Sequence, residues 1–247
     1  MKKTFKAIIS VLLVAVIVVA CFTACSNNTS NNDKVYKVGI CQLAQHEALD
    51  AATKGFRDAL TEKLGDKVIF DEKNASGEST NCTTIVSKFV SDKVDLILAN
   101  ATPALTAATE ATTTIPIVGT SITDYATALA ISDWNGKTGI NATGTADLAP
   151  LKEQAAMFKE LVPNAKTVGI IYCSAEPNSK YQADIVKSEL EALGYEVKVY
   201  TFVDTNDATN VMNEAVSNSQ AIYVPTDNTV ASNATLLNSI AEPAKVP

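Results

Sequence analysis

The chain has 247 residues, with 27 acidic and 20 basic side chains and one histidine, which gives a formal net charge of −7 at pH 7. This length is enough for two modest domains or one large one. An acidic chain without a cluster of Lys or Arg beyond its N-terminus argues against a nucleic-acid-binding protein.

The N-terminus has the pattern of a secretory signal. Three lysines, at positions 2, 3 and 6, precede an apolar run from Ala7 to Ala20. A run of about 14 residues is too short to span a bilayer comfortably and fits the apolar region of a signal peptide. We predict a signal over residues 1–24, followed by an Asn/Ser-rich tether over 25–34.

The segment after this run, VVACFTACSNNTSNND, resembles a bacterial lipoprotein signal. The resemblance implies that a lipid is attached to the cysteine at the cleaved N-terminus. Cys25 is the expected site because the polar tether begins directly after it, and Cys21 is the alternative because VVAC fits the usual pattern better than FTAC. An ordinary cleaved signal or a membrane anchor is a further alternative. We expect the folded part to lie on the extracytoplasmic face of the cell membrane, held there by the lipid.

From Val35 onward, short apolar strands alternate with amphipathic helices. In the first half, strands are expected near 35–41, 67–71, 95–99 and 116–119, with helices near 47–63, 79–92 and 102–112. The helix after Glu47 repeats apolar residues at i, i+3, i+4 and i+7, as a face packed on a sheet does. The segment VDLILA is a near-continuous apolar run, which is typical of a strand covered on both faces. This pattern predicts a parallel sheet between two layers of helices.

The second half repeats the organisation of the first. The segment TGINATGTADLAP is interpreted as the connection between two lobes, over 35–149 and 150–247. After it, strands are expected near 167–172, 196–202 and 220–224, and helices near 151–161, 179–193, 207–217 and 229–241. Both halves open with a strand that carries Val-Gly-Ile and later reach Leu-Gly. Two similar halves predict an α/β protein whose two lobes face each other across a cleft.

The last segment, AEPAKVP, stands where the first half has a fourth strand, in TTTIPIVGTS. We therefore expect this sequence to be truncated, without the rest of the second lobe and any return crossover to the first. The second lobe is predicted to be incomplete.

The loops after the strands are the expected ligand site, because open parallel sheets bind ligands at the carboxyl ends of their strands. Several of these loops open a helix, where unpaired N–H groups and the positive dipole end favour a carboxylate. Side chains able to add hydrogen bonds there are Thr102, Ser121, Ser179 and Asn228. Asp227, or less favourably Glu47 or Glu176, is a candidate partner for an ammonium group. The pattern fits a zwitterion, although each of these side chains is also an ordinary helix cap.

No catalytic or metal site is predicted, and no cofactor. His46 lies in a loop beside Glu47 without a nucleophile motif, so a polar helix start is its expected role. The sequence has no H-E-x-x-H, C-x-x-C, Walker or G-x-G-x-x-G pattern. Cys41, Cys82 and Cys173 are too far apart to predict a disulfide framework or metal ligands, and we expect buried free thiols.

The chain resembles the substrate-binding lipoproteins of ABC importers of the tryptophan/tyrosine type in the segments VGICQLAQHEALDAA, NASGEST, VDLILANATPA, IPIVGTSITD, AKTVGIIY, EPNS and YVPTDN. The resemblance covers residues 35–247. It implies two Rossmann-like lobes of the type I periplasmic-binding-protein class, joined by a hinge that closes over an amino acid. It also implies delivery of this ligand to a membrane permease driven by an ATPase, and several members are thought to take aromatic amino acids.

The same resemblance points to ligand-binding residues in each lobe. In the first lobe they are Gln42, His46, Ala101, Thr102, Pro103, Ser121, Thr123 and Asp124. In the second lobe they are Glu176, Asn178, Ser179, Thr226, Asp227 and Asn228. The chain departs from the family pattern at Gln45, where an acidic residue is common, and at Cys173, where Asn is common.

The mechanism implied is hinge closure by a monomer, in which the ligand contacts both lobes only in the closed state. Moving the ratio of closed to open protein from 1:99 to 99:1 needs about 5.5 kcal/mol of preference for the closed form. A few charge-assisted hydrogen bonds to the ligand supply this preference. Tyr125, Trp134 or Tyr181 are candidates to stack on an aromatic ligand, with a core or surface role as the alternative. Two other functions stay open: a lipoprotein that presents a ligand to a signalling receptor, and a secreted α/β enzyme.

Overall fold

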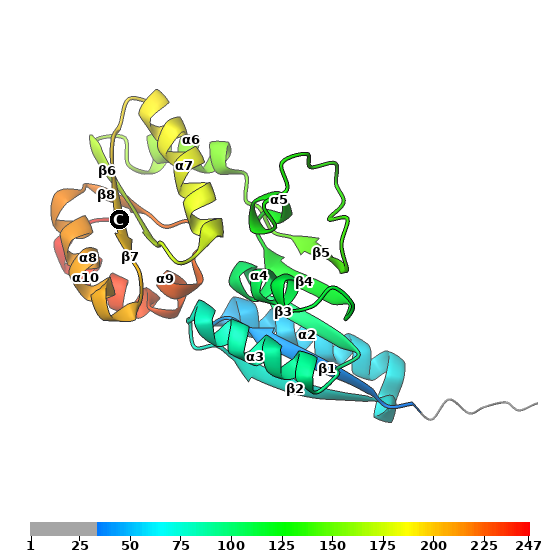
Figure 1. The fold of residues 1–247 in the computed structure, drawn as a ribbon. Coiled ribbons are helices and arrows are strands. Elements are labelled where there is room, and N and C mark those ends of the chain that lie inside the picture. Colours follow the sequence, from blue (N-terminus) through cyan, green and yellow to red (C-terminus); the bar gives the residue numbers. More distant parts are fainter. Residues whose placement is uncertain (1–33) are drawn as a thin grey trace, which may run out of the picture. The chain divides into compact units, whose positions relative to one another are not determined.

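The computed structural model describes residues 34–247. The predicted signal peptide, nearly all of the predicted tether and both candidate lipidation sites, Cys25 and Cys21, lie outside the described residues. Residues 35–247 contain two separate parallel sheets, each covered by helices (Figure 1). No helix in this described part is both long enough and apolar enough to cross a membrane.

The first lobe is built on a five-stranded sheet in the order β2-β1-β3-β4-β5, with all neighbours parallel. Its strands are β1 (Tyr36–Gln42), β2 (Val68–Asn74), β3 (Leu96–Asn100), β4 (Ile117–Ile122) and β5 (Ala142–Ala146). Its helices are α2 (Glu47–Leu64), the 3-10 turn η1 (Gly65–Lys67), α3 (Ser79–Ser91), α4 (Thr102–Ala111) and α5 (Tyr125–Ala128). The helix α2 packs on one face of the sheet, and α3 and α4 pack on the other.

Successive residues of β1 point to these two faces. Ile40 packs in the same cluster as Phe56 of α2, whereas Gly39 faces α3. A Cβ on Gly39 would lie 2.6 Å from the Phe89 ring, so only the absence of a side chain lets α3 approach the strand this closely.

The second lobe has a three-stranded parallel sheet in the order β7-β6-β8. Its strands are β6 (Thr167–Cys173), β7 (Glu196–Phe202) and β8 (Ala221–Tyr223). Its helices are α6 (Leu151–Leu161), α7 (Pro177–Ala192), α8 (Thr205–Asn218), α9 (Asn228–Ser232) and α10 (Ala234–Ala244). The helices α6 and α7 pack on one face, and α8 and α10 on the other.

The α/β class with two parallel sheets is confirmed, and three local predictions are corrected. Strand β5 lies inside the segment interpreted as a connection, because its Gly and Thr residues form an exposed edge strand without an apolar run. The short helix α5 is absent from the sequence prediction. The single helix expected near 229–241 is two helices, α9 and α10, which meet at Asn233.

Candidate functional site

Each sheet has one point at which the order of its strands reverses. This point lies between β1 and β3 in the first lobe and between β6 and β8 in the second. Loops that leave such a point run apart and create a crevice at the carboxyl ends of the strands. In these four loops or the helix starts after them lie the predicted residues His46, Ala101–Pro103, Glu176, Asn178, Ser179 and Thr226–Asn228.

Glu176 is at the centre of the predicted residues of the second lobe. Its side chain is buried, and its carboxylate accepts hydrogen bonds from the backbone N–H groups of Asn228 (3.1 Å) and Thr229 (2.8 Å). It also accepts from Asn228 Nδ2 (2.6 Å) and Thr229 Oγ1 (2.8 Å). These bonds join the start of α7 to the start of α9.

Asp227 caps α9 and is bonded entirely within its own lobe. Its Oδ1 accepts from the N–H of Val230 (2.7 Å), and its Oδ2 accepts from the N–H of Cys173 (2.8 Å). Burial, together with the nearby charge of Glu176, raises the pKa of Asp227 to about 7. Because both carboxyl oxygens already have partners, Asp227 is a less suitable partner for an ammonium group than the sequence indicates.

A second cluster in this lobe surrounds the carbonyl oxygen of Thr226. This oxygen accepts from Asn178 Nδ2 (3.0 Å), Ser179 Oγ (3.5 Å) and Gln182 Nε2 (3.3 Å). Gln182 Oε1 accepts in return from the N–H of Thr226 (3.2 Å). The sequence reasoning misses Gln182, although it follows Asn178 by four residues and therefore lies on the same helix face. Thr229 is missed as well.

The backbone is strained directly after β3 and near the end of β4. Ala101 has φ 89° and Ser121 has φ 57°, in the left-handed region that side chains other than glycine rarely adopt. The N–H of Ala101 donates to the carbonyl of Thr120 at 3.0 Å, which ties the residue after β3 to strand β4. Strain of this kind concentrates at ligand sites, where the surrounding structure maintains it.

The remaining candidates of the first lobe have structural partners. Asp124 caps α5 by accepting from the N–H of Thr127 (2.7 Å), and the Thr123 hydroxyl hydrogen-bonds with the carboxyl of Asp147. Tyr125 and Trp134, which were candidates to stack on a ligand, stack on each other with ring centroids 6.5 Å apart.

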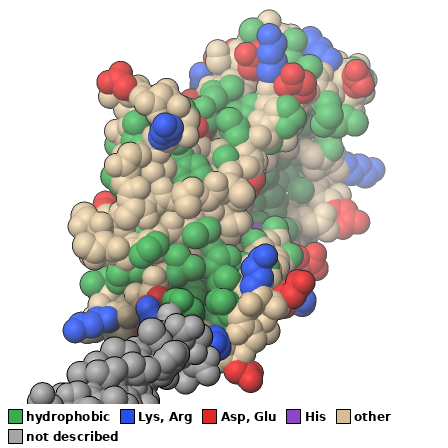
Figure 2. Space-filling view, turned by 90° about the vertical axis from the view of Figure 1, so that its right-hand side faces the viewer, with side chains coloured by type: hydrophobic (Ala, Val, Ile, Leu, Met, Phe, Trp, Pro, Cys, Tyr) green, Lys and Arg blue, Asp and Glu red, His purple; other side chains and the backbone are tan. Residues whose placement is uncertain are grey.

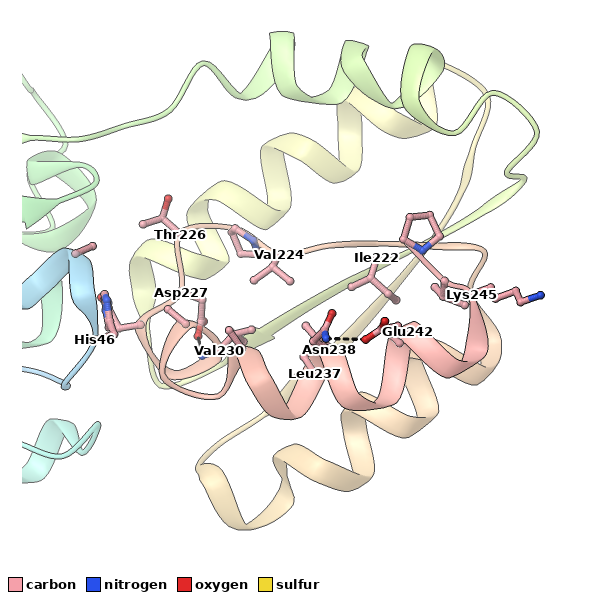
Figure 3. A pocket seen from close by; sticks show the side chains of 18 residues that line it. His46, Ile222, Val224, Thr226, Asp227, Val230, Leu237, Asn238, Glu242 and Lys245 are labelled. Carbon is pink, nitrogen blue, oxygen red and sulfur yellow. Dashed lines mark hydrogen bonds between the residues drawn. The ribbon is translucent and has the colours of Figure 1, made fainter.

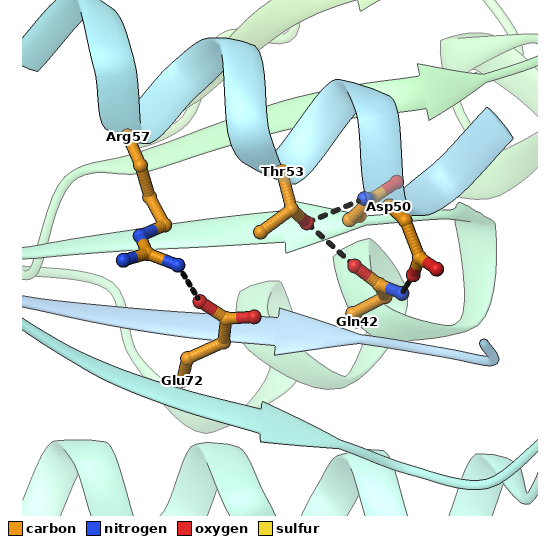
Figure 4. A network of polar contacts seen from close by, with 6 residues as sticks. Gln42, Asp50, Thr53, Arg57 and Glu72 are labelled. Carbon is orange, nitrogen blue, oxygen red and sulfur yellow. Dashed lines mark hydrogen bonds and ion pairs between the residues drawn. The ribbon is translucent and has the colours of Figure 1, made fainter. Parts of the chain in front are cut away.

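Gln42 ends β1, but its side chain is bonded to α2 and to the following loop (Figure 4). Its Nε2 donates to Asp50 Oδ1 (2.6 Å) and to the carbonyl of Ala44 (2.8 Å), and its Oε1 accepts from Thr53 Oγ1 (2.6 Å). Thr53 Oγ1 accepts in turn from Asn100 Nδ2 (2.9 Å). The Gln42 amide therefore holds the loop after β1 and, through Thr53, the end of β3.

Three buried polar atoms at these strand ends and helix starts have no hydrogen-bond partner. They are Asn100 Oδ1, Thr102 Oγ1 and Asn178 Oδ1. Asn100 and Thr102 lie at the end of β3 and the start of α4, and Asn178 lies in the first turn of α7, which contacts α4. In Figure 1 this first turn is the end of α7 nearest the first lobe. An unpartnered buried polar group costs about 1–3 kcal/mol, so each of these atoms would gain from a hydrogen-bond partner.

A hollow of about 800 Å³ lies between β8 with the loop after it and the helices α9 and α10. His46 lies at one end of it beside Asp227, and Lys245 lies at the other (Figure 3). Its lining is mainly apolar, including Ile222 and Leu237, and contains none of the three unpartnered atoms. This hollow therefore suits a zwitterion less well than the helix starts do.

Charged side chains do not form a metal site in the described part of the chain. Within residues 34–247, no group of three His, Cys, Asp or Glu side chains could hold a metal ion. On the face shown in Figure 2, acidic and basic side chains are interspersed rather than gathered by sign.

The chain is similar to known transport proteins. Residues 37–247 match the family model described as ABC transporter substrate binding protein. The chain is 35% identical to a tyrosine-binding protein of Clostridioides difficile (strain R20291), with 98% of this chain and 74% of that protein covered. A crystal structure of an ABC domain from Streptococcus pneumoniae in complex with L-Trp has 34% identity and a TM-score of 0.80, with 86% and 72% of the chains covered.

A third relative has a lower structural similarity to the chain. It is the ligand-free, open structure of a substrate-binding protein with adhesive properties from Clostridium difficile, with 36% identity and 86% and 73% of the chains covered. Its TM-score is 0.55, against 0.80 for the L-Trp complex at nearly equal identity and coverage. At nearly equal identity and coverage, the present structure is therefore more similar overall to the L-Trp complex than to the open, ligand-free structure.

Proposed function

This chain belongs to the family of ABC transporter substrate-binding proteins, and we propose that its ligand is a zwitterionic amino acid, preferably aromatic, held between the two lobes. The family predicted from the sequence is confirmed, and the chain is a solute-binding protein rather than an enzyme. Tyrosine and tryptophan, named for two relatives, support an aromatic ligand.

One observation carries the proposal, namely the unpartnered atoms at the helix starts of both lobes. The amide oxygens of Asn100 and Asn178 are buried acceptors, which suit the N–H groups of an ammonium. The hydroxyl of Thr102 lies in the first turn of α4, where the helix dipole favours a carboxylate. We therefore place the ammonium on amide oxygens instead of on Asp227, whose carboxylate is already bonded.

Transport would follow from closure of the lobes. A ligand that bonds to Thr102 and Asn178 together binds only when the two lobes are close, so its binding shifts the balance to the closed form. The closed form would then deliver the amino acid to a permease, with the binding protein acting as a monomer. Ser121, Ser179 and the other residues predicted by resemblance, apart from Asp227 and His46, are proposed to shape the same site.

A thermal-shift screen of the twenty amino acids tests the proposal. We expect the melting temperature to rise with tyrosine or tryptophan, because a ligand that binds only the folded state stabilises it. Analogues that block one charge, such as an N-acetyl amino acid and an amino-acid amide, are expected to give no rise. A response to the blocked analogues but not to the parent amino acids would contradict a zwitterion site.

We also propose that the chain is a lipoprotein anchored on the extracytoplasmic face, with residues 1–24 as signal, 25–34 as tether and lobes over 35–149 and 150–247. The apolar run and the cysteines that follow it support this proposal. Mass spectrometry of the mature N-terminal peptide tests it, with Cys25→Ser expected to abolish lipidation and Cys21→Ser expected to preserve it. The reverse result would assign the lipid to Cys21.

A further inference from the structure

A hydrogen bond joins the two lobes at the loop after β1. His46 lies directly before α2 in the first lobe, and its Nε2 is 3.2 Å from Oδ1 of Asn228, the first residue of α9 in the second. The other side-chain hydrogen bonds that the structure shows within residues 35–247 each join residues of one lobe, as Gln42 to Asp50 and Tyr223 to Gln154 do. The contact between His46 and Asn228 therefore reports on the distance between the lobes.

The direction of this bond is set by Glu176. Asn228 Nδ2 donates to Glu176 Oε2 at 2.6 Å, so the amide presents its oxygen to His46. Because this oxygen can only accept, the hydrogen-bond network assigns a hydrogen to Nε2 of His46. The neutral imidazole with its proton on Nε2 and the charged imidazolium both meet this requirement, so the bond forms in either charge state.

Both partners are held in place by their own lobes. Asn228 is 7% exposed, and its backbone N–H and side-chain amide both donate to the buried Glu176 carboxylate. His46 is half-buried, and its carbonyl accepts from the N–H of Asp50 at 3.0 Å at the start of α2. The acceptor and the donor therefore exist before closure, and the bond needs only the approach of the lobes.

We propose that His46 and Asn228 form a latch, a hydrogen bond that forms on closure and favours the closed state whatever side chain the ligand carries. This proposal rests on the proposed function. The resemblance assigns His46 to the ligand, whereas the geometry assigns its Nε2 to the opposite lobe. The structure is more similar to the L-Trp complex than to the open, ligand-free relative, which supports reading this contact as one of the closed form.

A latch and a ligand contact predict different patterns of affinity. A latch changes the fraction of closed protein, so its loss raises the apparent dissociation constant of each ligand by the same factor. For one uncharged hydrogen bond this factor is about three- to tenfold. Loss of a side chain that contacts the ligand, in contrast, changes the affinity for one amino acid more than for another.

The test is calorimetric titration of the full chain with tyrosine and with tryptophan, for the wild type and three variants of His46. His46→Gln keeps an N–H donor near the position of Nε2, whereas His46→Asn is too short to reach Asn228 and His46→Ala has no donor. We expect the Ala and Asn variants to lose about three- to tenfold in affinity for both ligands and His46→Gln to bind like the wild type. Unchanged affinity in His46→Ala, or a loss confined to one ligand, overturns the latch.

A measurement without ligand separates this proposal from the proposed function. If the wild type binds none of the twenty amino acids, the proposed function fails, and the latch is judged from small-angle scattering of the unliganded chain. A larger radius of gyration for His46→Ala than for the wild type and His46→Gln supports the latch. Equal radii for all three overturn it.

Discussion

Asp227 and Glu176 are neighbouring buried carboxyl groups, with side chains 3% and 2% exposed. They hold the starts of α7 and α9 together through different donors, since Asp227 accepts from Cys173 and Val230 while Glu176 accepts from Asn228 and Thr229. Burial and, after it, the nearby charge of Glu176 raise the pKa of Asp227. The pair therefore links the stability of the second lobe to pH.

The free energy of unfolding should fall as the pH rises from about 4 to about 7. In this range folded Asp227 holds a proton, whereas in the unfolded chain its pKa of 3.8 leaves it ionised. The folded state therefore binds more protons, and its stability declines by a few kcal/mol over this interval. Urea unfolding at several pH values measures this contribution as the difference between the wild type and Asp227→Asn, in which it is absent.

Asp204→Asn is the matched control for that experiment, because Asp204 also caps a helix, α8, by accepting from the N–H of Asn206 at 2.8 Å. It lies partly exposed and away from Glu176. We expect this variant to keep the pH slope of the wild type. A slope that persists unchanged in Asp227→Asn would show that another group causes it.

Thr102→Val should stabilise the ligand-free protein and weaken amino-acid binding. The Thr102 hydroxyl is buried without a partner, so a methyl group of similar size removes a cost of about 1 kcal/mol or more. The loss of a bond to a charged ligand group should raise the dissociation constant about tenfold or more. Chemical unfolding and calorimetry measure the two effects on the same samples.

Ser219→Ala provides the comparison, because the Ser219 hydroxyl is likewise buried without a partner but lies after α8, away from the helix starts. It should stabilise the protein without changing affinity. If Thr102→Val bound the amino acid with wild-type affinity, Thr102 would not be part of the ligand site.

Gly39→Ala should destabilise the first lobe by about 1–3 kcal/mol, because the new methyl group would lie 2.6 Å from the Phe89 ring and force α3 or the ring to move. Gly55→Ala is the contrasting change. Gly55 is exposed within α2 with no atom in contact range, and alanine there should stabilise by about 0.5–1 kcal/mol. Denaturant midpoints compare the two variants, and similar effects of both would contradict the close packing of α3 on β1.

Cys41, Cys82 and Cys173 should resist thiol reagents until the protein unfolds. All three are free and buried. The hydrogen bond with Cys82 and then burial raise the pKa of the Cys41 thiol, and burial raises the pKa of Cys173 to about 11, which suppresses the reactive thiolate at both positions. The same bond lowers the pKa of Cys82, so the resistance of Cys82 rests on its burial. Maleimide labelling followed by peptide mapping, before and after addition of guanidinium chloride, checks each position separately. Rapid labelling of Cys173 in the folded protein would contradict its burial.

The sequence predicts the regular elements better than the contacts of the site. The apolar period after Glu47 predicts a helix over 47–63, and α2 spans Glu47–Leu64. Strand β5 escapes prediction because an exposed edge strand needs no apolar pattern. The side chain of Gln42 bonds to Thr53 of α2, and the amide nitrogen of Asn100 bonds to the same residue, which leaves the amide oxygen of Asn100 without a partner. Both arrangements depend on how α2 packs on the sheet. Neither property has a signal in local sequence.

Titration of the purified protein with L-tyrosine by isothermal calorimetry, with tyramine as the comparison, tests the central claim most directly. Tyramine has the same ring and amine but no carboxylate. We predict saturable binding of one tyrosine per chain and at least about a hundredfold weaker binding of tyramine, because groups at the start of α4 lose their charged partner. Equal affinity for the two compounds, or no binding of tyrosine or any other amino acid, would contradict a site for a zwitterion between the lobes.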